Sequence, residues 1–207
     1  MANEEIRLAN IETVLQAAIN LFVENGIENT TREMLARASG LSRRSTERYF
    51  PSKSDYVVQA AEWFAKSLAE KQNSVKMLEQ GQCTADEALR AFFEELKQSL
   101  LKEPRIYICF AEAKGYIYRN CENRADDYKN LLEAIGWQCI LQKIFQKGEQ
   151  DGTLKCQFGP EKTARYLANT IVSFFSNLVL LYDQQPEMME SCATTYITDM
   201  WNLYCNQ

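Results

Sequence analysis

The chain has 207 residues, of which 46% are hydrophobic and 25% are charged. That hydrophobic content is too high for a disordered chain, and the length suits one or two small domains. With four prolines, eight glycines and long periodic segments, the sequence predicts an all-α fold. There is no histidine, and the seven cysteines form no CxxC pair. We therefore expect no zinc or other metal site, no cofactor and no disulfide framework, and thiols kept reduced in the cytoplasm.

Charge is distributed unevenly along the chain. The formal net charge is −5, yet residues 31–56 hold six lysines and arginines against three acidic residues. This segment therefore carries +3, and the remaining residues carry −8. A basic patch on an acidic body suits a protein that contacts DNA through one surface, and it argues against a bulk polycation. Ordinary surface arginines are the alternative reading of the patch.

The first helix is expected over residues 6–25, where apolar residues recur at spacings of three and four. The N-terminus has early acidic residues and no apolar core, so we expect no signal peptide. The longest uncharged run, residues 166–182, is shorter than the roughly 20 residues of a membrane span. We read it as a helix buried in protein, and we expect no membrane association.

Residues 30–53 predict two short helices joined by a tight turn. Thr31 suits the N-cap of the first helix, and Gly40 suits its left-handed stop. Ser42 can cap the second helix, which begins with Arg43 and Arg44 and ends before Pro51. A helix, a glycine-containing turn and a second helix that opens with cations form the layout of a helix-turn-helix DNA reader.

Several motifs between Ile11 and Lys53 occur in order and at fixed spacing: Ala17-Ala18, Leu21-Phe22, Glu24-Asn25-Gly26, Thr30-Thr31, the run 36–42 and the run 49–53. Through them this segment, roughly the first quarter of the chain, resembles the N-terminal domain of the TetR family of bacterial transcriptional regulators. The resemblance implies a homodimer that pairs through its last two long helices. It also implies a palindromic DNA operator and a second domain that varies in sequence.

The second helix of the motif supplies the predicted base contacts. Arg43 and Arg44 lie in its first turn, the part that enters the major groove. An arginine can donate two hydrogen bonds to guanine, worth about 1–3 kcal/mol of discrimination. The resemblance adds Thr31, Tyr49 and Lys53 as contacts to the DNA backbone. The predicted DNA-binding residues are Thr31, Arg32, Ser42, Arg43, Arg44, Ser45, Glu47, Arg48, Tyr49 and Lys53.

Three residues depart from the usual pattern of the family. Arg44 stands where a glycine is common, Thr46 where a core leucine is common, and Glu47 where a tyrosine usually contacts phosphate. A carboxylate at position 47 could accept a hydrogen bond from cytosine N4, or it could pair with Arg43 or Arg44 and aim them. We favour the pairing. The departures bear on the operator sequence and leave the motif intact.

The rest of the chain predicts six more helices, for about nine in all. Ser52 and Asp55 are expected to form a capping box at the start of a helix over 53–75. This helix would connect the two domains and transmit movement between them. Thr84 and Glu87 are expected to form a second capping box at the start of the next helix. The six ranges are 53–75, 84–102, 104–115, 127–150, 160–182 and 186–205, with a loop over 116–126. We assign residues 1–56 to a DNA-binding domain and residues 57–207 to an effector-binding and dimerisation domain.

The second domain is rich in aromatic residues, which could line a pocket for an apolar or aromatic effector or simply fill the core. The candidate pocket residues are Trp63, Phe64, Phe93, Tyr107, Phe110, Trp137 and Phe174, with Asn169, Ser173 and Asn177 as orienting polar groups. The helix over 160–182 is apolar on nearly every side, so we expect a partner subunit to cover it. The candidate interface residues are Leu167, Val172, Phe175, Val179, Tyr196 and Met200.

Taken together, the sequence predicts a DNA-binding transcriptional regulator that acts as a homodimer on a palindromic operator. Repression, with release by a small-molecule effector, is the expected mode. An enzyme is not expected, because the chain has no histidine, no nucleotide-binding glycine loop and no nucleophile motif. Two alternatives stay open, namely an activator with the same fold and a helical adaptor that binds only protein.

Overall fold

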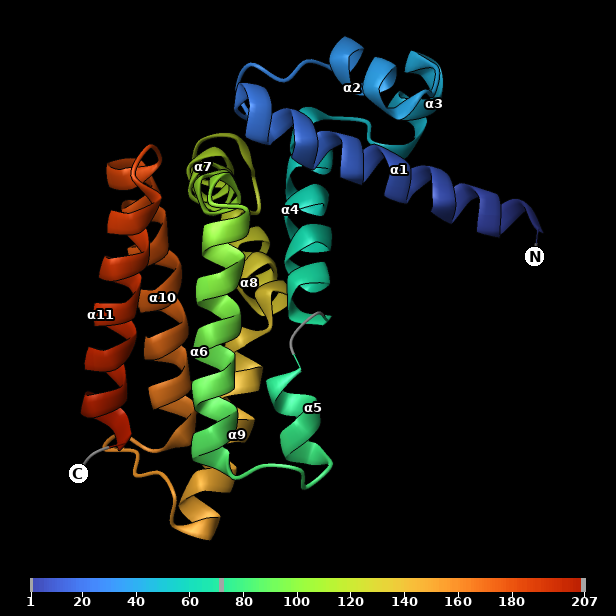
Figure 1. The fold of residues 1–207 in the computed structure, drawn as a ribbon. Helices are drawn as coiled ribbons and strands as arrows, with labels where there is room; N and C mark the ends of the chain where they lie inside the picture. The colour runs from blue at the N-terminus through green and yellow to red at the C-terminus, as the bar shows by residue number, and fades with distance from the viewer. Residues whose placement is uncertain (1, 71–72, 206–207) are drawn as a thin grey trace. The chain divides into compact units, whose positions relative to one another are not determined.

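The computed structural model describes the backbone of residues 2–70 and 73–205, and within these ranges every regular element is an α-helix (Figure 1). The predicted all-α class is confirmed, with eleven helices in the described ranges where about nine were expected. In chain order they are α1 (Ala2–Asn25), α2 (Arg32–Ser39), α3 (Arg43–Tyr49), α4 (Lys53–Glu70), α5 (Ser74–Glu79), α6 (Ala85–Lys102), α7 (Arg105–Asn120), α8 (Arg124–Ile135), α9 (Trp137–Asp151), α10 (Pro160–Tyr182) and α11 (Pro186–Cys205).

The helix predicted over 53–75 ends earlier, and a separate short helix follows it. Helix α4 ends at Glu70, residues 71 and 72 lie outside the described residues, and α5 begins at Ser74. The carboxylate of Glu95 on α6 accepts hydrogen bonds from the backbone N–H groups of Asn73 and Ser74 at 3.1 and 3.2 Å. An acceptor from another helix thus satisfies the free N-terminal donors of α5, a device that no local sequence signal reveals.

Gly136 and Gly115 differ from the sequence prediction, because the first ends a helix and the second does not. Residues 127–150 do not form one helix, because Gly136 takes a left-handed conformation with φ of 72° and separates α8 from α9. Conversely, α7 runs through Gly115 to Asn120, so most of the predicted 116–126 loop is helical at its two ends. Tyr116 and Ile117 are 5% and 1% exposed, and their burial extends α7 past the glycine.

The chain divides into two compact units. Unit 1 comprises residues 1–67 and 109–134, and unit 2 comprises residues 68–108 and 135–207. Helices α4 and α7 each begin in one unit and end in the other. This division follows packing, and the boundary of the DNA-binding domain at residue 56 stays a prediction.

Unit 1 is built around α1. Helix α2 packs against α1 and α3 against α2 (Figure 1). The buried residues include Val14 and Phe22 of α1, Leu35 of α2 and Tyr56 of α4, and the rings of Phe22 and Tyr56 stack at 6.3 Å. Burial of the apolar faces of α1, α2 and α4 fixes the orientation in which α3 is presented.

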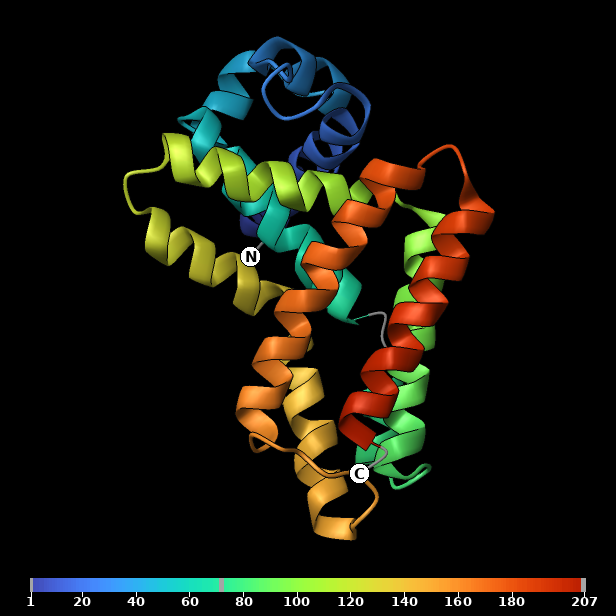
Figure 2. The ribbon, with the colours of Figure 1, turned by 90° about the vertical axis from the view of Figure 1, so that its left-hand side faces the viewer.

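Unit 2 is a helical bundle in which α6, α9, α10 and α11 run alongside one another (Figure 2). Short α5 packs on α6 and α9. Helices α1 and α10 each contain a stretch long and apolar enough to cross a membrane by length and composition. Burial explains this for α10, because residues such as Leu167, Ile171 and Phe175 are fully buried in the bundle.

Gly148 permits a close approach within unit 2. A Cβ atom built on this buried residue of α9 would lie 2.5 Å from the Cβ of Leu154. We expect Gly148→Ala to destabilise the protein by about 1–3 kcal/mol, because Leu154 and its backbone must shift. Thermal denaturation measures this. Gly115→Ala is the matched control: its Cβ would meet only the tip of the Arg119 side chain, so unchanged or slightly raised stability is expected. Equal effects of the two changes would contradict the packing argument.

Candidate nucleic-acid interface

Local capping shapes the two reading helices as the sequence predicts. The Thr31 hydroxyl accepts a hydrogen bond from the backbone N–H of Met34 at 3.3 Å, which caps α2. Gly40 ends α2 with φ of 69°. The Ser42 hydroxyl accepts from the backbone N–H of Ser45 at 3.1 Å and caps α3. Because Thr31 and Ser42 already hold the helix starts, their exposed hydroxyls are fixed in place.

Arg43 is held by two carboxylates. Its Nε donates to Glu47 at 2.9 Å, and its Nη1 donates to Glu33 at 2.6 Å. The predicted pairing of Glu47 with Arg43 is therefore present. The hydrogen bond from Arg43 lowers the pKa of the Glu47 carboxyl, and Arg32, 3.5 Å away, adds to this effect. Glu47 is thus kept ionised and largely neutralised at the face where a bare carboxylate would repel phosphate.

Arg44 differs from its neighbour. It is exposed in the first turn of α3, and in the described part of the chain its side chain forms no hydrogen bond or ion pair. Its five N–H donors are free for an external acceptor. Thr46, the second departure from the family pattern, is 1% exposed and faces the core, where its hydroxyl donates to the Ser42 carbonyl at 3.2 Å.

Removing the charge of Glu47 tests its restraining role. We expect Glu47→Gln to raise the affinity for duplexes of random sequence, because the variant removes a negative charge from the reading face and loosens Arg43. Fluorescence anisotropy in a salt series measures this. Glu133→Gln, an exposed carboxylate on α8, is the charge-matched control. An increase no larger than that of the control would contradict the assigned role.

The far end of α3 is tied to α1 through a tyrosine hydroxyl. Tyr49 accepts hydrogen bonds from Asn10 Nδ2 at 3.3 Å and from Arg48 Nη2 at 3.1 Å. These donors, Asn10 first, lower the pKa of the Tyr49 phenol. No local sequence pattern indicates this role of Asn10, which lies 39 residues from Tyr49 in the chain. A DNA phosphate that approached the Tyr49 hydroxyl would therefore also lie close to the Arg48 guanidinium.

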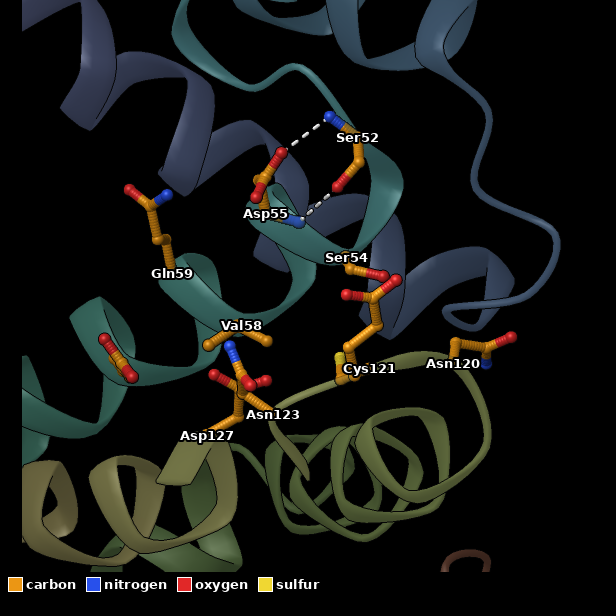
Figure 3. Close-up of a pocket in the computed structure, with 11 residues that line it drawn as sticks. Ser52, Ser54, Asp55, Val58, Gln59, Asn120, Cys121, Asn123 and Asp127 are labelled. Atoms are coloured by element: carbon orange, nitrogen blue, oxygen red, sulfur yellow. Dashed lines mark hydrogen bonds between the residues drawn. The ribbon is translucent and has the colours of Figure 1, made fainter. Parts of the chain in front are cut away.

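Lys53 and Arg32 are also used inside unit 1. Lys53 Nζ donates to the Glu28 carbonyl at 2.8 Å, and burial lowers its pKa. Arg32 donates to the carbonyl of Pro51. The Ser52–Asp55 capping box is present, with Ser52 N–H donating to Asp55 at 2.6 Å and Asp55 N–H to Ser52 at 3.1 Å (Figure 3). DNA contact by Lys53 and Arg32 stays a prediction.

A polar crevice of about 570 Å³ lies between the start of α4 and residues 120–127. Figure 3 shows Ser54 and Val58 of α4 next to Cys121, Asn123 and Asp127, whereas the amide of Gln59 points away from them. Burial raises the pKa of Glu62 in this crevice, and the nearby Asp127 adds to the increase. Burial also raises the pKa of the Cys121 thiol, which therefore stays protonated.

The aromatic residues of the predicted pocket divide between the units. Trp63, Phe64 and Phe110 belong to unit 1, where the rings of Phe64 and Phe110 lie 6.0 Å apart. Unit 2 holds a continuous aromatic cluster, in which each ring lies 4.1–6.5 Å from the next; its members are Phe92, Phe93, Tyr107, Trp137, Phe174, Phe175 and Tyr196. The polar trio Asn169, Ser173 and Asn177 is exposed on α10 and does not share the burial of these rings.

Most of the predicted dimer contacts lie on α10, and the dimer itself stays a prediction. Leu167, Val172, Phe175 and Val179 are at most 3% exposed, so the fold of a single chain already covers them. Helix α10 has a solvent face that ends in Leu180 and Leu181, which are 68% and 66% exposed. The helix predicted to be apolar on nearly every side therefore has a solvent face, which also carries Asn169 and Ser173. Tyr196 and Met200 are half-buried on α11.

These features define a helix-turn-helix DNA-binding protein: a capped helix pair, a positive-φ glycine in the turn and a second helix led by two exposed arginines. Residues 14–60 match the family model described as bacterial regulatory proteins, tetR family. The N-terminal part of this chain is therefore a TetR-family helix-turn-helix domain, a module that binds DNA.

Solved structures share the fold over nearly the whole chain. A TetR transcription regulator from Haloarcula marismortui has a TM-score of 0.72 at 18% identity, covering 93% of this chain and 98% of its own. The regulator FadR from Bacillus subtilis, solved with stearoyl-CoA, has a TM-score of 0.71 at 15% identity, covering 91% and 96%. FadR from Thermus thermophilus, solved with lauroyl-CoA, has a TM-score of 0.61 at 20% identity, covering 91% and 93%. No curated protein sequence matches the chain.

Proposed function

We propose that this protein is a cytoplasmic repressor that binds a palindromic operator as a homodimer and leaves it when a small molecule binds unit 2. The reading surface carries the proposal. Arg44 is exposed and unpaired among the described residues, and Arg43 is held beside it by Glu33 and Glu47. The Arg44 guanidinium is thus free to donate hydrogen bonds to a guanine, while the Arg43 guanidinium is already held in one orientation.

A homodimer follows from the size of the recognition surface and from the exposed apolar residues. Helix α3 has seven residues and reaches only a few base pairs, so specific binding needs two copies on successive turns of the groove. Leu180 and Leu181 of α10 and Met188 and Leu203 of α11 are between 47% and 68% exposed. A two-fold contact through these helices would cover this apolar surface.

Release by a small molecule is supported by the make-up of unit 2. Five of its helices contribute rings to the aromatic cluster, an environment suited to an apolar ligand. Two FadR proteins of similar fold were solved with acyl-CoA molecules. The effector would act by binding more tightly to the conformation that cannot span both half-sites.

Duplex DNA from the region upstream of the protein's own gene tests the proposal. We expect sedimentation to give a dimer, and fluorescence anisotropy to give binding that weakens steeply as salt rises. A duplex of scrambled sequence is the control. A chain that stays monomeric and does not bind either duplex at low salt would refute the proposal and favour a protein-binding adaptor. Transcription from the bound promoter separates repression from activation.

A further inference from the structure

Two polar side chains inside the aromatic cluster have no hydrogen-bond partner. In the described part of the chain, Tyr107 Oη and Trp137 Nε1 are buried and unpaired. Tyr107 is 0% exposed, Trp137 is 1% exposed, and their rings lie 6.4 Å apart. Burial raises the pKa of the Tyr107 phenol and Ser99 partly offsets this increase, but Ser99 is not a hydrogen-bond partner of the hydroxyl. Buried donors are rarely left unpaired, because each loses its bond to water on folding.

Tyr196, the third aromatic residue of the cluster with a polar atom, does have a hydrogen-bond partner. Tyr196 Oη donates to Thr170 Oγ1 at 2.9 Å. Tyr56 in unit 1 is as buried as Tyr107, at 1% exposed, and its hydroxyl donates to the Thr30 carbonyl at 3.3 Å. Among the described residues, Thr163 is the third buried side chain without a partner, and it lies outside the aromatic cluster. Trp137 also lies directly after Gly136, at the break between α8 and α9.

The surroundings of the two donors limit what can bind them. Phe92 meets Trp137 edge to face at 6.5 Å, and Phe175 meets Tyr107 edge to face at 5.5 Å. The unpaired atoms are uncharged donors among apolar rings. A carboxylate buried there would lack the positive partner that offsets its desolvation, whereas a neutral carbonyl oxygen needs only the donors.

From these observations we propose that the aromatic cluster is the closed form of the effector site, and that the effector is an apolar, uncharged molecule whose carbonyl oxygen accepts hydrogen bonds from Tyr107 Oη and Trp137 Nε1. This inference rests on the proposed function only in that it calls the ligand an effector, because binding of the ligand to the aromatic cluster does not require DNA. Binding would recover the hydrogen bonds that the empty site lacks, and the aromatic rings would part to stack on the ligand.

Melting of tyrosine variants tests the unpaired hydroxyl without any ligand. We expect Tyr107→Phe to raise the melting temperature of the free protein by about 2–4 °C, because it removes a buried donor without a partner. Tyr56→Phe, the matched control, should lower it, because that change breaks a hydrogen bond. A lowered melting temperature for Tyr107→Phe would show that the hydroxyl has a partner, such as Ser99, and would overturn the proposal.

Three naphthalene probes test the ligand class. We expect 2-acetylnaphthalene to bind the native chain about tenfold more tightly than 2-ethylnaphthalene, which has the same rings and no carbonyl. The tenfold ratio should shrink in Tyr107→Phe. Binding should also move the indole ¹⁵N–¹H resonance of Trp137, which Trp137→Phe identifies by its loss. Tighter binding of 2-naphthoate than of the ketone would refute the uncharged class, and equal binding of ketone and hydrocarbon would refute the donor pair.

The outcomes separate this proposal from the proposed function. Probe binding and melting are measured on the protein alone, whereas operator binding is measured with DNA. A chain that binds its operator but does not discriminate the ketone keeps the function and loses the site. A chain that discriminates the ketone but ignores DNA keeps the site and loses the function.

Discussion

Arg44→Ala is expected to weaken operator binding by about 1–3 kcal/mol at each half-site, and so to lower the affinity of a dimer, which has two half-sites, at least about thirtyfold. The physical reason is that Arg44 is exposed in the first turn of α3 and, among the described residues, has no internal partner. Its loss should therefore leave the fold unchanged and remove only intermolecular contacts. Anisotropy titrations of the cognate operator and a circular dichroism melt measure the two effects.

Arg37→Ala is the matched control for this change. Arg37 is an exposed arginine of the same unit, but it lies in the last turn of α2 and not on α3. Both variants remove one positive charge, so any difference between them reports position. If Arg44 reads a base, its loss should also relax sequence preference, whereas loss of a phosphate contact would weaken all duplexes alike and lower the salt dependence by about one unit. Equal losses for the two variants would contradict a reading role.

Elements with local signals could be predicted from the sequence. The caps at Thr31, Ser42 and Ser52 and the stop at Gly40 each depend on residues within three or four positions, and all were found. Arg43 and Glu47 face each other one helical turn apart, so their ion pair could also be predicted. The helix-turn-helix motif consists of such short-range interactions, so the sequence alone is enough to predict it.

Features set by distant residues could not be predicted. Helix α5 starts where Glu95 caps it from α6, and the hydroxyl of Tyr49 is held by Asn10. The candidate pocket shows the same limit. Asn169, Ser173 and Asn177 share one stripe of α10, and a stripe alone does not tell which side faces the core. Tyr107 and Trp137 could not be predicted to lack hydrogen-bond partners, because this depends on which acceptors the five packed helices place within their reach.

The connection between α1 and α2 is held from outside by Glu112 of α7, another contact that no local pattern reveals. Glu112 Oε2 accepts a hydrogen bond from the backbone N–H of Ile27 at 2.9 Å, 85 residues away in sequence. Ile27 is 2% exposed and follows Gly26, which ends α1 with φ of 78°. Arg119, also on α7, reaches Glu28 at 3.3 Å. Two residues of α7, one in its middle and one in its last turn, therefore hold the segment that leads into α2 and α3.

We expect Glu112→Ala to destabilise the protein by about 1.5–3 kcal/mol, because it leaves the Ile27 N–H without its charged acceptor. For a chain of this size the melting temperature should fall by about 3–12 °C. Operator affinity should also fall, since α2 begins at Arg32, only five residues after Ile27, and a loosened entry lets the helix pair move. Glu112→Gln keeps an acceptor oxygen at the same reach and should recover most of both losses. If the alanine and glutamine variants melt and bind DNA alike, the contact between Glu112 and Ile27 does not hold the reading helices in place.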